Sequence, residues 1–346
     1  MANRKKRVAS IADVAKAAGV STATVSRVFN KRDSVHPETR NHVMAAADKI
    51  GFQLSDRRPG PKPPPQELRP VVRFFHFIDE ETDGEVESNK TLVMIKRGVE
   101  TATEEAGFRS IYDVRSSKDG IALPPEEGET IGAVLLGSPS PQAEKILRKL
   151  PCCWVMTGAG SPDWGDQVMP DHREVGRLAA RYLVERGHER IVLLRYGPRD
   201  RVHRFREEGF EYEMNRFPDV KWKVVDSGVM PEGPTTFLSS EEMLETLTKN
   251  LKTCSLKPTG VFVDQDRTLL MLYPKLLKAG LVLGENLDVI SCNNMDIYRR
   301  QLPFEYKSID VHFEMVGRLG VGQLLWRMQN PGISSQVRSL MLPELP

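Results

Sequence analysis

The sequence predicts a protein of two parts, a small all-α head followed by a larger α/β body. The first 69 residues carry 14 Lys and Arg against 6 Asp and Glu, whereas the remainder carries 35 against 41. Apolar residues recur at helical spacing between residues 10 and 51. After residue 70, short apolar runs alternate with helical patterns, which is typical of βαβ units and parallel sheets. A chain of 346 residues is also too long for one ordinary core.

The head begins with a helix whose two ends are both marked. Ser10 followed by Asp13 resembles a capping box, which starts a helix. Gly19 ends this helix, because glycine adopts the left-handed conformation without strain. The apolar side chains between these ends fall on one helical face: Ile11, Val14, Ala15 and Ala18.

Two further helices follow the first. Ser21 is suited to cap a helix from Thr22 to about Phe29, and Pro37 is suited to the first turn of a helix that ends at Gly51. Two short helices joined by a Gly-Val-Ser turn form a helix-turn-helix. The second helix of such a motif enters the major groove of DNA.

The predicted second helix carries side chains that suit contacts with DNA. Its N-terminal turns would present these residues to base edges: Thr22, Ala23, Ser26 and Arg27. Ser21, Asn30 and Thr39 are small polar groups suited to phosphate oxygens. Two alternatives stay open, because Ser21 can be a helix cap alone and Arg27 can form a salt bridge with Asp33 or Glu38.

Two stretches within residues 10–52 resemble the DNA-binding headpiece of the LacI/GalR regulators. They are SIADVAKAAGVSTATVSRVFN at residues 10–30 and VHPETRNHVMAAADKIGF at residues 35–52. This resemblance implies that Thr22, Ala23 and Arg27 occupy the base-reading positions of the recognition helix. His36 departs from the family, which often has a Ser that caps the third helix and contacts phosphate. A histidine caps a helix less well than a serine.

The segment 55–69 also departs from the family. Most relatives form a short hinge helix here, but Pro59, Pro61 and Pro63–Pro65 block a helical turn. We expect an extended, polyproline-like linker. Arg57 and Arg58 in this slim frame can lie in an A·T-rich minor groove, as basic arms of other readers do. The alternative is a stiff spacer without DNA contacts.

The body, residues 70–346, reads as two parallel sheets in two lobes. Strands are predicted at 71–78, 109–114, 132–136, 153–156, 191–194, 261–263 and 289–290, and helices at 91–106, 175–186 and 269–279. Small ligands bind at the carboxyl ends of strands in such folds. We therefore expect a ligand between the lobes.

Three segments of the body extend the resemblance to the same regulators: residues 171–194, 258–291 and 308–325. It implies a periplasmic-binding-protein-like fold with three crossovers between the lobes and a dimer contact on the helix 91–106. The resemblance also places ligand-binding positions at Asp171, Arg206, Gln265, Asp266 and Asn293. Gln265 and Asn293 are neutral amides where relatives commonly have other side chains, so the usual carboxylate clamp is incomplete.

Alternatives accompany these positions. Asp266 can cap the helix that follows it, and Arg206 can pair with Glu207, Glu208 or Glu211. Trp222, which lies in a divergent stretch, is the tryptophan best suited to a ligand pocket, although tryptophans more often pack in the core.

The sequence argues against enzymes and metalloproteins. It contains no GxSxG, GxxxxGK[ST] or HExxH motif, and His188 lies in a helix-to-strand turn that favours a structural role. Cys152, Cys153, Cys254 and Cys292 form no CxxC pair, so buried small hydrophobes are expected rather than a zinc site or a disulfide. We predict no cofactor, metal or catalytic residue. No apolar run is long enough to span a membrane, and a cytoplasmic location is expected.

These observations predict a DNA-binding domain at residues 1–54, a basic Pro-rich linker at 55–69 and a ligand-binding and dimerisation domain at 70–346. The expected function is transcriptional regulation by a homodimer that binds a pseudo-palindromic DNA site. A small molecule, by resemblance a carbohydrate, would modulate the DNA affinity. Two alternatives remain: a small-molecule binding protein without regulatory output, and an architectural protein of the DNA minor groove.

Overall fold

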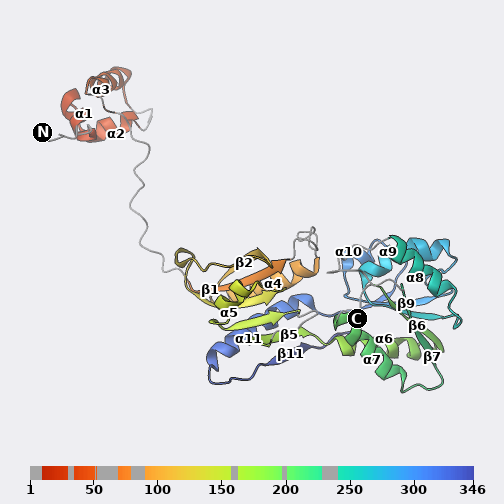
Figure 1. Ribbon diagram of the computed structural model, residues 1–346. Coiled ribbons are helices and arrows are strands. Elements are labelled where there is room, and N and C mark those ends of the chain that lie inside the picture. Colours follow the sequence, from red (N-terminus) through yellow and green to blue (C-terminus); the bar gives the residue numbers. More distant parts are fainter. Residues whose placement is uncertain are drawn as a thin grey trace. The chain divides into compact units, whose positions relative to one another are not determined.

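The computed structural model describes residues 10–29, 35–50, 52, 69–78, 90–156, 163–196, 201–227 and 241–346. The chain divides into two compact units, Met1–Glu67 and Leu68–Pro346. The predicted fold class is confirmed: the first unit is a helix-turn-helix domain, and the second is an α/β domain with two parallel sheets (Figure 1).

The first unit contains the helices α1 (Ile11–Ala18), α2 (Thr22–Phe29) and α3 (Pro37–Lys49). The predicted capping box is present, since Ser10 Oγ accepts from Asp13 N at 3.3 Å and Asp13 Oδ2 accepts from Ser10 N at 2.8 Å. Gly19 ends α1 with a φ of 61°, in the left-handed region. Local signals in the sequence thus fix both ends of α1.

A small core holds the three helices together. It consists of Val14, Ala15, Ala18, Val25, Val28, Val43 and Ala47. The ring centroids of Phe29 and Phe52 lie 5.3 Å apart at its margin. Ile11 was expected on this buried face but is 42% exposed, because the packed face of α1 starts only at Val14.

The first sheet of the body has the strand order β11-β5-β4-β3-β1-β2, and all its pairings are parallel. Its strands are β1 (Val71–Ile78), β2 (Arg109–Ser116), β3 (Thr130–Leu136), β4 (Cys152–Val155), β5 (Asp166–Pro170) and β11 (Arg338–Met341). A 3-10 turn, Pro125–Glu127, precedes β3.

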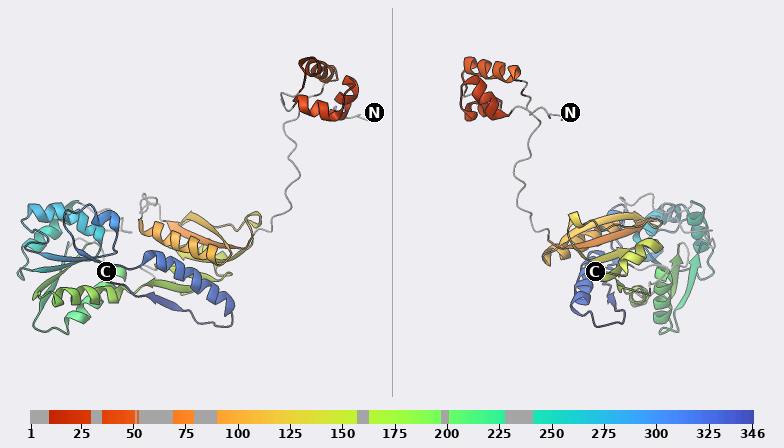
Figure 2. Two further views of the ribbon diagram at one scale, coloured as in Figure 1. Left: turned by 180° about the vertical axis from the view of Figure 1, so that it is seen from behind. Right: turned by 60° about the vertical axis from the view of Figure 1, so that its left-hand side comes forward.

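Helices cover both faces of this sheet, as Figure 2 shows in two views. They are α4 (Lys90–Glu105), α5 (Pro141–Leu147) and α11 (Phe313–Gln329). Val72 and Phe74 of β1 pack in the cluster that includes residues of α4 and α11, whereas Phe75 and Phe77 pack in the cluster that includes α5. Alternate residues of a strand point to opposite faces, so β1 is apolar on both sides.

The second sheet is also parallel and has the order β10-β9-β8-β6-β7. Its strands are β6 (Arg190–Arg195), β7 (Lys221–Asp226), β8 (Gly260–Val263), β9 (Asp288–Cys292) and β10 (Lys307–Ile309). The helices of this lobe are α6 (His172–Glu185), α7 (Arg201–Met214), α8 (Glu241–Lys252), α9 (Asp266–Lys278) and α10 (Asp296–Arg299). Apolar side chains of α6 and α7 pack in one cluster and those of α8 and α9 in another.

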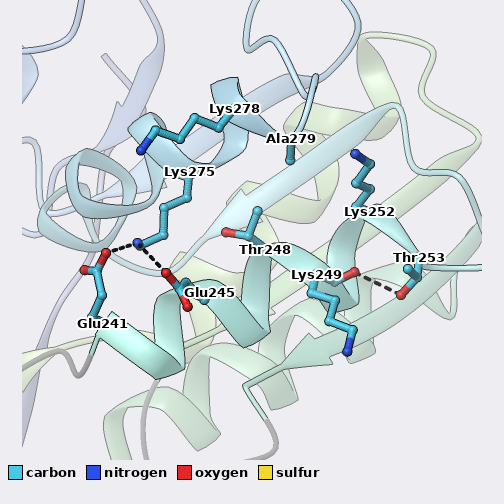
Figure 3. A pocket seen from close by; sticks show the side chains of 9 residues that line it. All are labelled: Glu241, Glu245, Thr248, Lys249, Lys252, Thr253, Lys275, Lys278 and Ala279. Carbon is cyan, nitrogen blue, oxygen red and sulfur yellow. Dashed lines mark hydrogen bonds and ion pairs between the residues drawn. The ribbon is translucent and has the colours of Figure 1, made fainter.

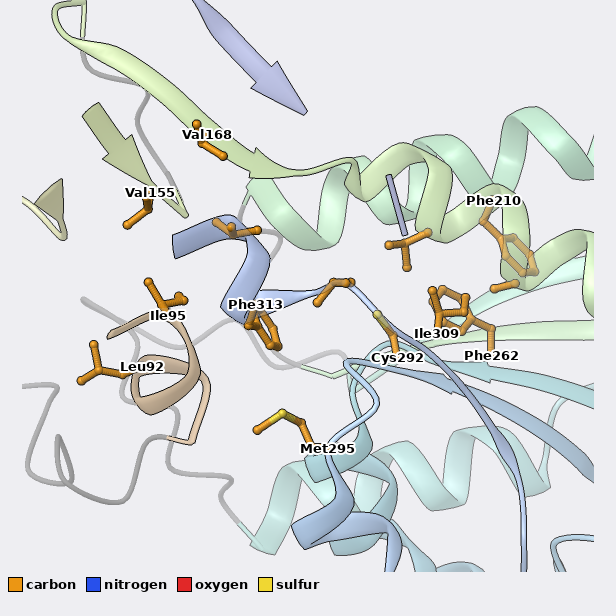
Figure 4. Packing of buried hydrophobic residues seen from close by; sticks show 14 of the residues in the cluster. Leu92, Ile95, Val155, Val168, Phe210, Phe262, Cys292, Met295, Ile309 and Phe313 are labelled. Carbon is orange, nitrogen blue, oxygen red and sulfur yellow. The ribbon is translucent and has the colours of Figure 1, made fainter. Parts of the chain in front are cut away.

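The chain passes from the first sheet to the second after β5, back after β10, and again toward the second sheet after β11. Asp171 N donates to Met341 O at 2.8 Å, and Asp310 and Glu344 exchange two backbone hydrogen bonds. One buried cluster includes residues of both lobes, such as Val168 and Ile95 with Phe210 and Ile309 (Figure 4). The three crossings therefore lie beside a continuous apolar core.

Two expectations need correction. Helix α9 begins at Asp266, three residues before the predicted start, because Asp266 and Thr268 are polar but have buried side chains in the structure. Cys152, Cys153 and Cys292 are buried as predicted, but Cys254 is half-exposed in the turn after α8.

Candidate functional sites

The first candidate site is the exposed side of α2 in the three-helix unit. Ser21, Thr22, Ala23 and Arg27 are exposed, and Ser26 is half-buried. Val25 and Val28, on the other side of α2, are buried in the core. The same helix therefore anchors itself through its valines and presents its polar residues to solvent.

Ser21 acts as a cap in this arrangement, since its Oγ accepts from Thr24 N at 3.1 Å. Arg27 has no carboxylate within 4 Å in the part of the chain that the structure describes. Glu38, one of its alternative partners, lies 3.9 Å from His36 instead. Asp33, the other alternative, lies outside the described residues. Among the described residues, the guanidinium of Arg27 therefore has no acidic partner.

The other residues predicted to contact DNA lie either near α3 or outside the described residues. Thr39 is half-buried in α3, and His36 forms no side-chain cap at the start of that helix. Asn30, Arg57 and Arg58 lie outside the described residues, as does most of the Pro-rich linker.

The second candidate site lies at the carboxyl ends of β8 and β9 in the second sheet. Asp264 and Gln265 follow β8, and Asn293 follows β9. Arg206 of α7 reaches both strand ends, because Nη1 donates to Asp264 O and Nη2 donates to Asn293 Oδ1 at 3.1 Å. The structure therefore brings together three of the residues that the sequence singled out: Arg206, Gln265 and Asn293.

Arg206 is 3% exposed, and its Nε has no hydrogen-bond partner. Two of its three predicted alternative partners are engaged elsewhere: Glu207 pairs with Arg195 at 2.8 Å, and Glu208 pairs with Arg173 at 2.7 Å. The third, Glu211, is exposed. The structure shows no salt bridge between Arg206 and any of the three glutamates. A buried guanidinium normally has such a partner.

Two glycines set the position of Arg206. A Cβ atom added to Gly176 of α6 would lie 1.9 Å from the carbonyl oxygen of Arg206, and one added to Gly209 of α7 would lie 1.9 Å from that of Arg173. No side chain fits at either position, so α6 and α7 touch backbone to backbone. This close crossing carries Arg206 to the strand ends.

His203 and Asp264 belong to the same cluster, although neither was predicted from the sequence. His203 Nε2 lies 2.9 Å from Asp264 Oδ2 and 3.2 Å from Gln265 Nε2, and both His203 and Asp264 are buried. The spacing of His203 and Arg206 by three residues places both on one face of a helix. In the sequence, this spacing and the polar residues that follow the apolar strand β8 are the two features that indicate the cluster.

Asp266 lies beside this cluster, but its carboxylate is bound internally. It accepts from Met295 N at 2.8 Å, from Ser308 Oγ at 2.8 and 3.0 Å, and from Tyr306 Oη at 3.2 Å. Burial raises the pKa of Asp266 above its usual value, and the hydrogen bonds oppose this effect. These contacts tie the start of α9 to the turn after β9 and to β10.

The structure does not bring Asp171 and Trp222 into the cluster through any contact. Asp171 caps α6 by accepting from Arg173 N and Glu174 N, both at 3.1 Å, at the first crossing between the lobes. Trp222 is the second residue of β7 and pairs with Ile191, near the beginning of β6. Its ring packs against Phe210 with centroids 5.7 Å apart. Trp222 therefore lies at the amino ends of the strands, away from Asn293.

A separate hollow of about 390 Å³ lies between α8 and α9 (Figure 3). Lys275 pairs there with Glu241 and, at 3.6 Å, with Glu245. The hollow contains none of the residues predicted to bind a ligand.

His188 Nδ1 lies 3.2 Å from Thr259 Oγ1 and its Nε2 lies 3.1 Å from Asp288 Oδ2, which connects a helix-to-strand turn to the start of β9. Across the described ranges, no three His, Cys, Asp or Glu side chains gather as metal ligands do. None of the helices in those ranges has the length and hydropathy needed to cross a membrane.

Comparison with known proteins gives matches to both units. The family of bacterial regulatory proteins, lacI family, matches residues 10–55, and the periplasmic binding protein-like domain matches residues 180–345. The HTH-type transcriptional regulator GanR of Bacillus subtilis (strain 168) is 25% identical over 316 residues, which cover 88% of this chain and 89% of GanR.

Two further proteins are similar over nearly the whole length. The ribose operon repressor of Escherichia coli (strain K12) is 24% identical over 346 residues and covers 95% of this chain and 96% of its own. A solved complex of the transcriptional regulator CelR with cellobiose has a TM-score of 0.59 at 20% identity and covers 98% of both chains. The relatives are transcriptional regulators, and the solved structure shares the fold.

Proposed function

This chain belongs to the LacI/GalR family of transcriptional regulators, and on this premise we propose that it is a sequence-specific DNA-binding repressor controlled by a small molecule. The DNA-binding domain would comprise residues 1–54, the linker 55–69, and the sensor and dimerisation domain 70–346. The effector would bind between the lobes of the sensor domain and change the affinity for the operator.

The observation that carries this proposal is the two-sided character of α2. Its valines are buried, while Thr22, Ala23 and Arg27 are exposed and Arg27 has no carboxylate within 4 Å among the described residues. Thr and Ala methyl groups suit thymine, and Arg suits guanine. Ser21, Ser26, Asn30 and Thr39 would contact phosphates or neighbouring base edges, and Arg57 and Arg58 would contact the minor groove.

We further propose that the protein acts as a homodimer. One recognition helix contacts only a few base pairs, so two copies related by a two-fold axis would read a pseudo-palindromic operator. The helix α4 is the candidate dimer face, and its Val93 is 49% exposed.

The candidate effector is a carbohydrate or a carbohydrate derivative. The polar cluster around Arg206, Gln265 and Asn293 can both donate and accept hydrogen bonds, as recognition of hydroxyl groups requires. The similar CelR structure is a cellobiose complex, and the similar Escherichia coli protein is a ribose operon repressor. Asp171 at the crossing and Asp266 beneath the cluster would support this site, and Trp222 would contact ligand only through a rearrangement.

We also propose that the protein is cytoplasmic and has no catalytic activity. The residues at the two candidate sites suit binding, and the relatives are regulators.

An effector shifts the equilibrium between two lobe arrangements only as far as it binds one of them more tightly. An extended Pro-rich linker would transmit this shift more weakly than an ordered helix, so we expect the effector to change operator affinity by less than about a hundredfold.

Selection of bound duplexes from a random double-stranded DNA pool tests the DNA-binding function. The full-length protein should enrich an inverted repeat, and the Arg27→Ala variant should lose preference at one base pair of each half-site. Each lost bidentate contact would cost about 1–3 kcal/mol of discrimination. A variant with Lys149→Ala, at an exposed position just after α5, is the control for removal of one positive charge.

The same selection distinguishes the alternatives. An architectural minor-groove protein would bind the pool without enriching a motif, and a binding protein without regulatory output would retain no duplex at all. Either result would contradict the proposed repressor.

A further inference from the structure

The charge at the carboxyl ends of β8 and β9 indicates the chemical class of the effector. The Arg206 guanidinium is 3% exposed, yet among the described residues no carboxylate lies within 4 Å of it. Its partners are two neutral oxygens, Asp264 O and Asn293 Oδ1, and its Nε has none. Buried charges are normally paired, because neutral acceptors only partly replace the lost hydration.

The two nearby carboxylates do not neutralise this guanidinium directly. Asp264 lies 2.9 Å from His203, and Asp266 accepts hydrogen bonds from Met295 N, Ser308 and Tyr306. Neither carboxylate oxygen of Asp264 has a hydrogen-bond partner, whereas the carboxylate of Asp266 is held by three residues. Among the described residues, neither carboxylate lies within 4 Å of the Arg206 guanidinium. Among the arginines that the structure describes, only Arg206 combines deep burial with an unpartnered donor.

The start of α9 adds to this positive character. Gln265 is the N-cap residue of this 13-residue helix, but its side chain makes no capping hydrogen bond. The first N–H groups of a helix carry a partial positive charge and bind anions when no side chain caps them. Gln265 and Asp264 are adjacent, so the helix start and Arg206 lie at the same strand end.

We propose that the effector carries an anionic oxygen group, either a carboxylate or a phosphate, and that Arg206 binds this group. The inference rests on the proposed function and narrows it from carbohydrates in general to acidic ones. A planar guanidinium with free donors suits both groups. Asn293 leaves Arg206 able to bind an anionic ligand, because an aspartate at position 293 would supply the countercharge from within the protein.

Thermal unfolding of the full-length chain tests the inference with matched probes. These are glucose, gluconate, glucuronate, glucose 6-phosphate and inorganic phosphate, each compared with potassium chloride at equal ionic strength. We expect at least one acidic probe to raise the midpoint by roughly 5 °C near saturation, while glucose has no effect. Carboxylates and phosphates form separate arms, so the result also identifies which anion is bound.

The Asn293→Asp variant is the sharpest control. Asn293 has a φ of 95°, which aspartate also tolerates, and its Oδ1 lies 3.1 Å from Arg206 Nη2. The new carboxylate should pair with Arg206 and abolish the response to acidic probes. Asn215→Asp makes the same charge change at an exposed position after α7 and should keep the response.

Three results would overturn the inference: no response of the natural protein to any anion, an equal response to glucose, or an undiminished response in Asn293→Asp. The unliganded midpoint of Asn293→Asp should be at least that of the natural protein, which confirms that the variant is folded. Failure here is distinct from failure of the proposed repressor, because operator selection is measured independently. A neutral sugar that alters operator affinity would refute the acidic effector and leave the repressor intact.

Discussion

Arg327 and Asp166 form a bidentate ion pair at the edge of the first sheet. Arg327 Nε donates to Asp166 Oδ2 at 2.9 Å, and Nη2 donates to Oδ1 at 2.5 Å. The same carboxylate accepts from Val337 N at 2.9 Å and is 2% exposed. It therefore joins α11 to the start of β5 and to the chain that enters β11.

Asp166→Asn should destabilise the body by about 3 kcal/mol at neutral pH, because it leaves Arg327 without its buried countercharge. Burial alone would raise the pKa of Asp166, but the hydrogen bonds from Arg327, Val337 and Gln323 outweigh it and lower the pKa. The ionised carboxylate thus stabilises the fold above its unfolded pKa, and this contribution disappears as the pH falls through the folded value. The unfolding midpoints of Asp166→Asn and of the natural protein should therefore differ clearly at pH 7 and differ less at pH 3.

Asp296→Asn is the control for that experiment. Asp296 forms an exposed pair with Arg300 on α10, and such pairs contribute little. If Asp296→Asn lost as much stability as Asp166→Asn, burial of the ion pair would not be the cause of the stability loss.

Asp266 should show the opposite dependence on pH. Its pKa is raised, chiefly by burial, so the fold favours the neutral carboxyl group. Ionisation should cost stability as the pH rises from the unfolded pKa to above the folded one. The Asp266→Asn variant should therefore gain stability relative to the natural protein as the pH rises, and it should still bind operator. A variant that becomes relatively less stable toward neutral pH would contradict this assignment.

Two glycines of α11 should respond in opposite ways to alanine. A Cβ at Gly317 would lie 2.2 Å from Ile95 O of α4, whereas one at Gly322 would meet nothing within 4 Å. We expect Gly317→Ala to destabilise the body by about 1–3 kcal/mol through overpacking. Gly322→Ala should stabilise it by about 0.5–1 kcal/mol, because alanine favours a helix interior. Denaturant unfolding of both variants measures this, and equal effects would refute the close crossing of α4 and α11.

The contrast between these glycines shows what the sequence could and could not reveal. Apolar runs identified β1, β3, β4, β6, β8 and β9, because strands buried on both faces are continuously hydrophobic. Capping signals located α1, since they act between neighbours in the chain. Gly317 and Gly322 look alike in sequence, and only the position of α4 distinguishes them.

The candidate sensor site was predictable in part for the same reason. Arg206 and Asn293 were identified, but that no described carboxylate lies within 4 Å of Arg206 depends on which residues α7 and β8 bring together. Trp222 was expected to suit a pocket, yet the register of β7 with β6 places it near the amino ends of the strands. A divergent stretch of sequence does not reveal which end of a strand a residue occupies.

Ser21 can be tested for its two roles separately. Ser21→Ala removes the cap on Thr24 N and should cost about 1 kcal/mol of stability. Ser21→Asp keeps a capping oxygen, because aspartate is a good N-cap, but it would repel a phosphate. We expect Ser21→Asp to unfold like the natural protein and to bind operator at least roughly tenfold more weakly, about 1.4 kcal/mol. Unchanged DNA affinity of this variant would assign Ser21 to capping alone.

The linker arginines give the last prediction. If Arg57 and Arg58 lie in the minor groove, replacing both by alanine should lower operator affinity and flatten the salt dependence. Each lost phosphate neutralisation reduces the slope of log K against log salt by about 0.9, so the pair should reduce it by nearly 2. Lys145→Ala with Lys149→Ala removes the same charge from exposed positions at and just beyond α5 and serves as the control. If the arginine variant keeps the natural slope across the salt series, the linker is a spacer, and sequence recognition must come from α2 alone.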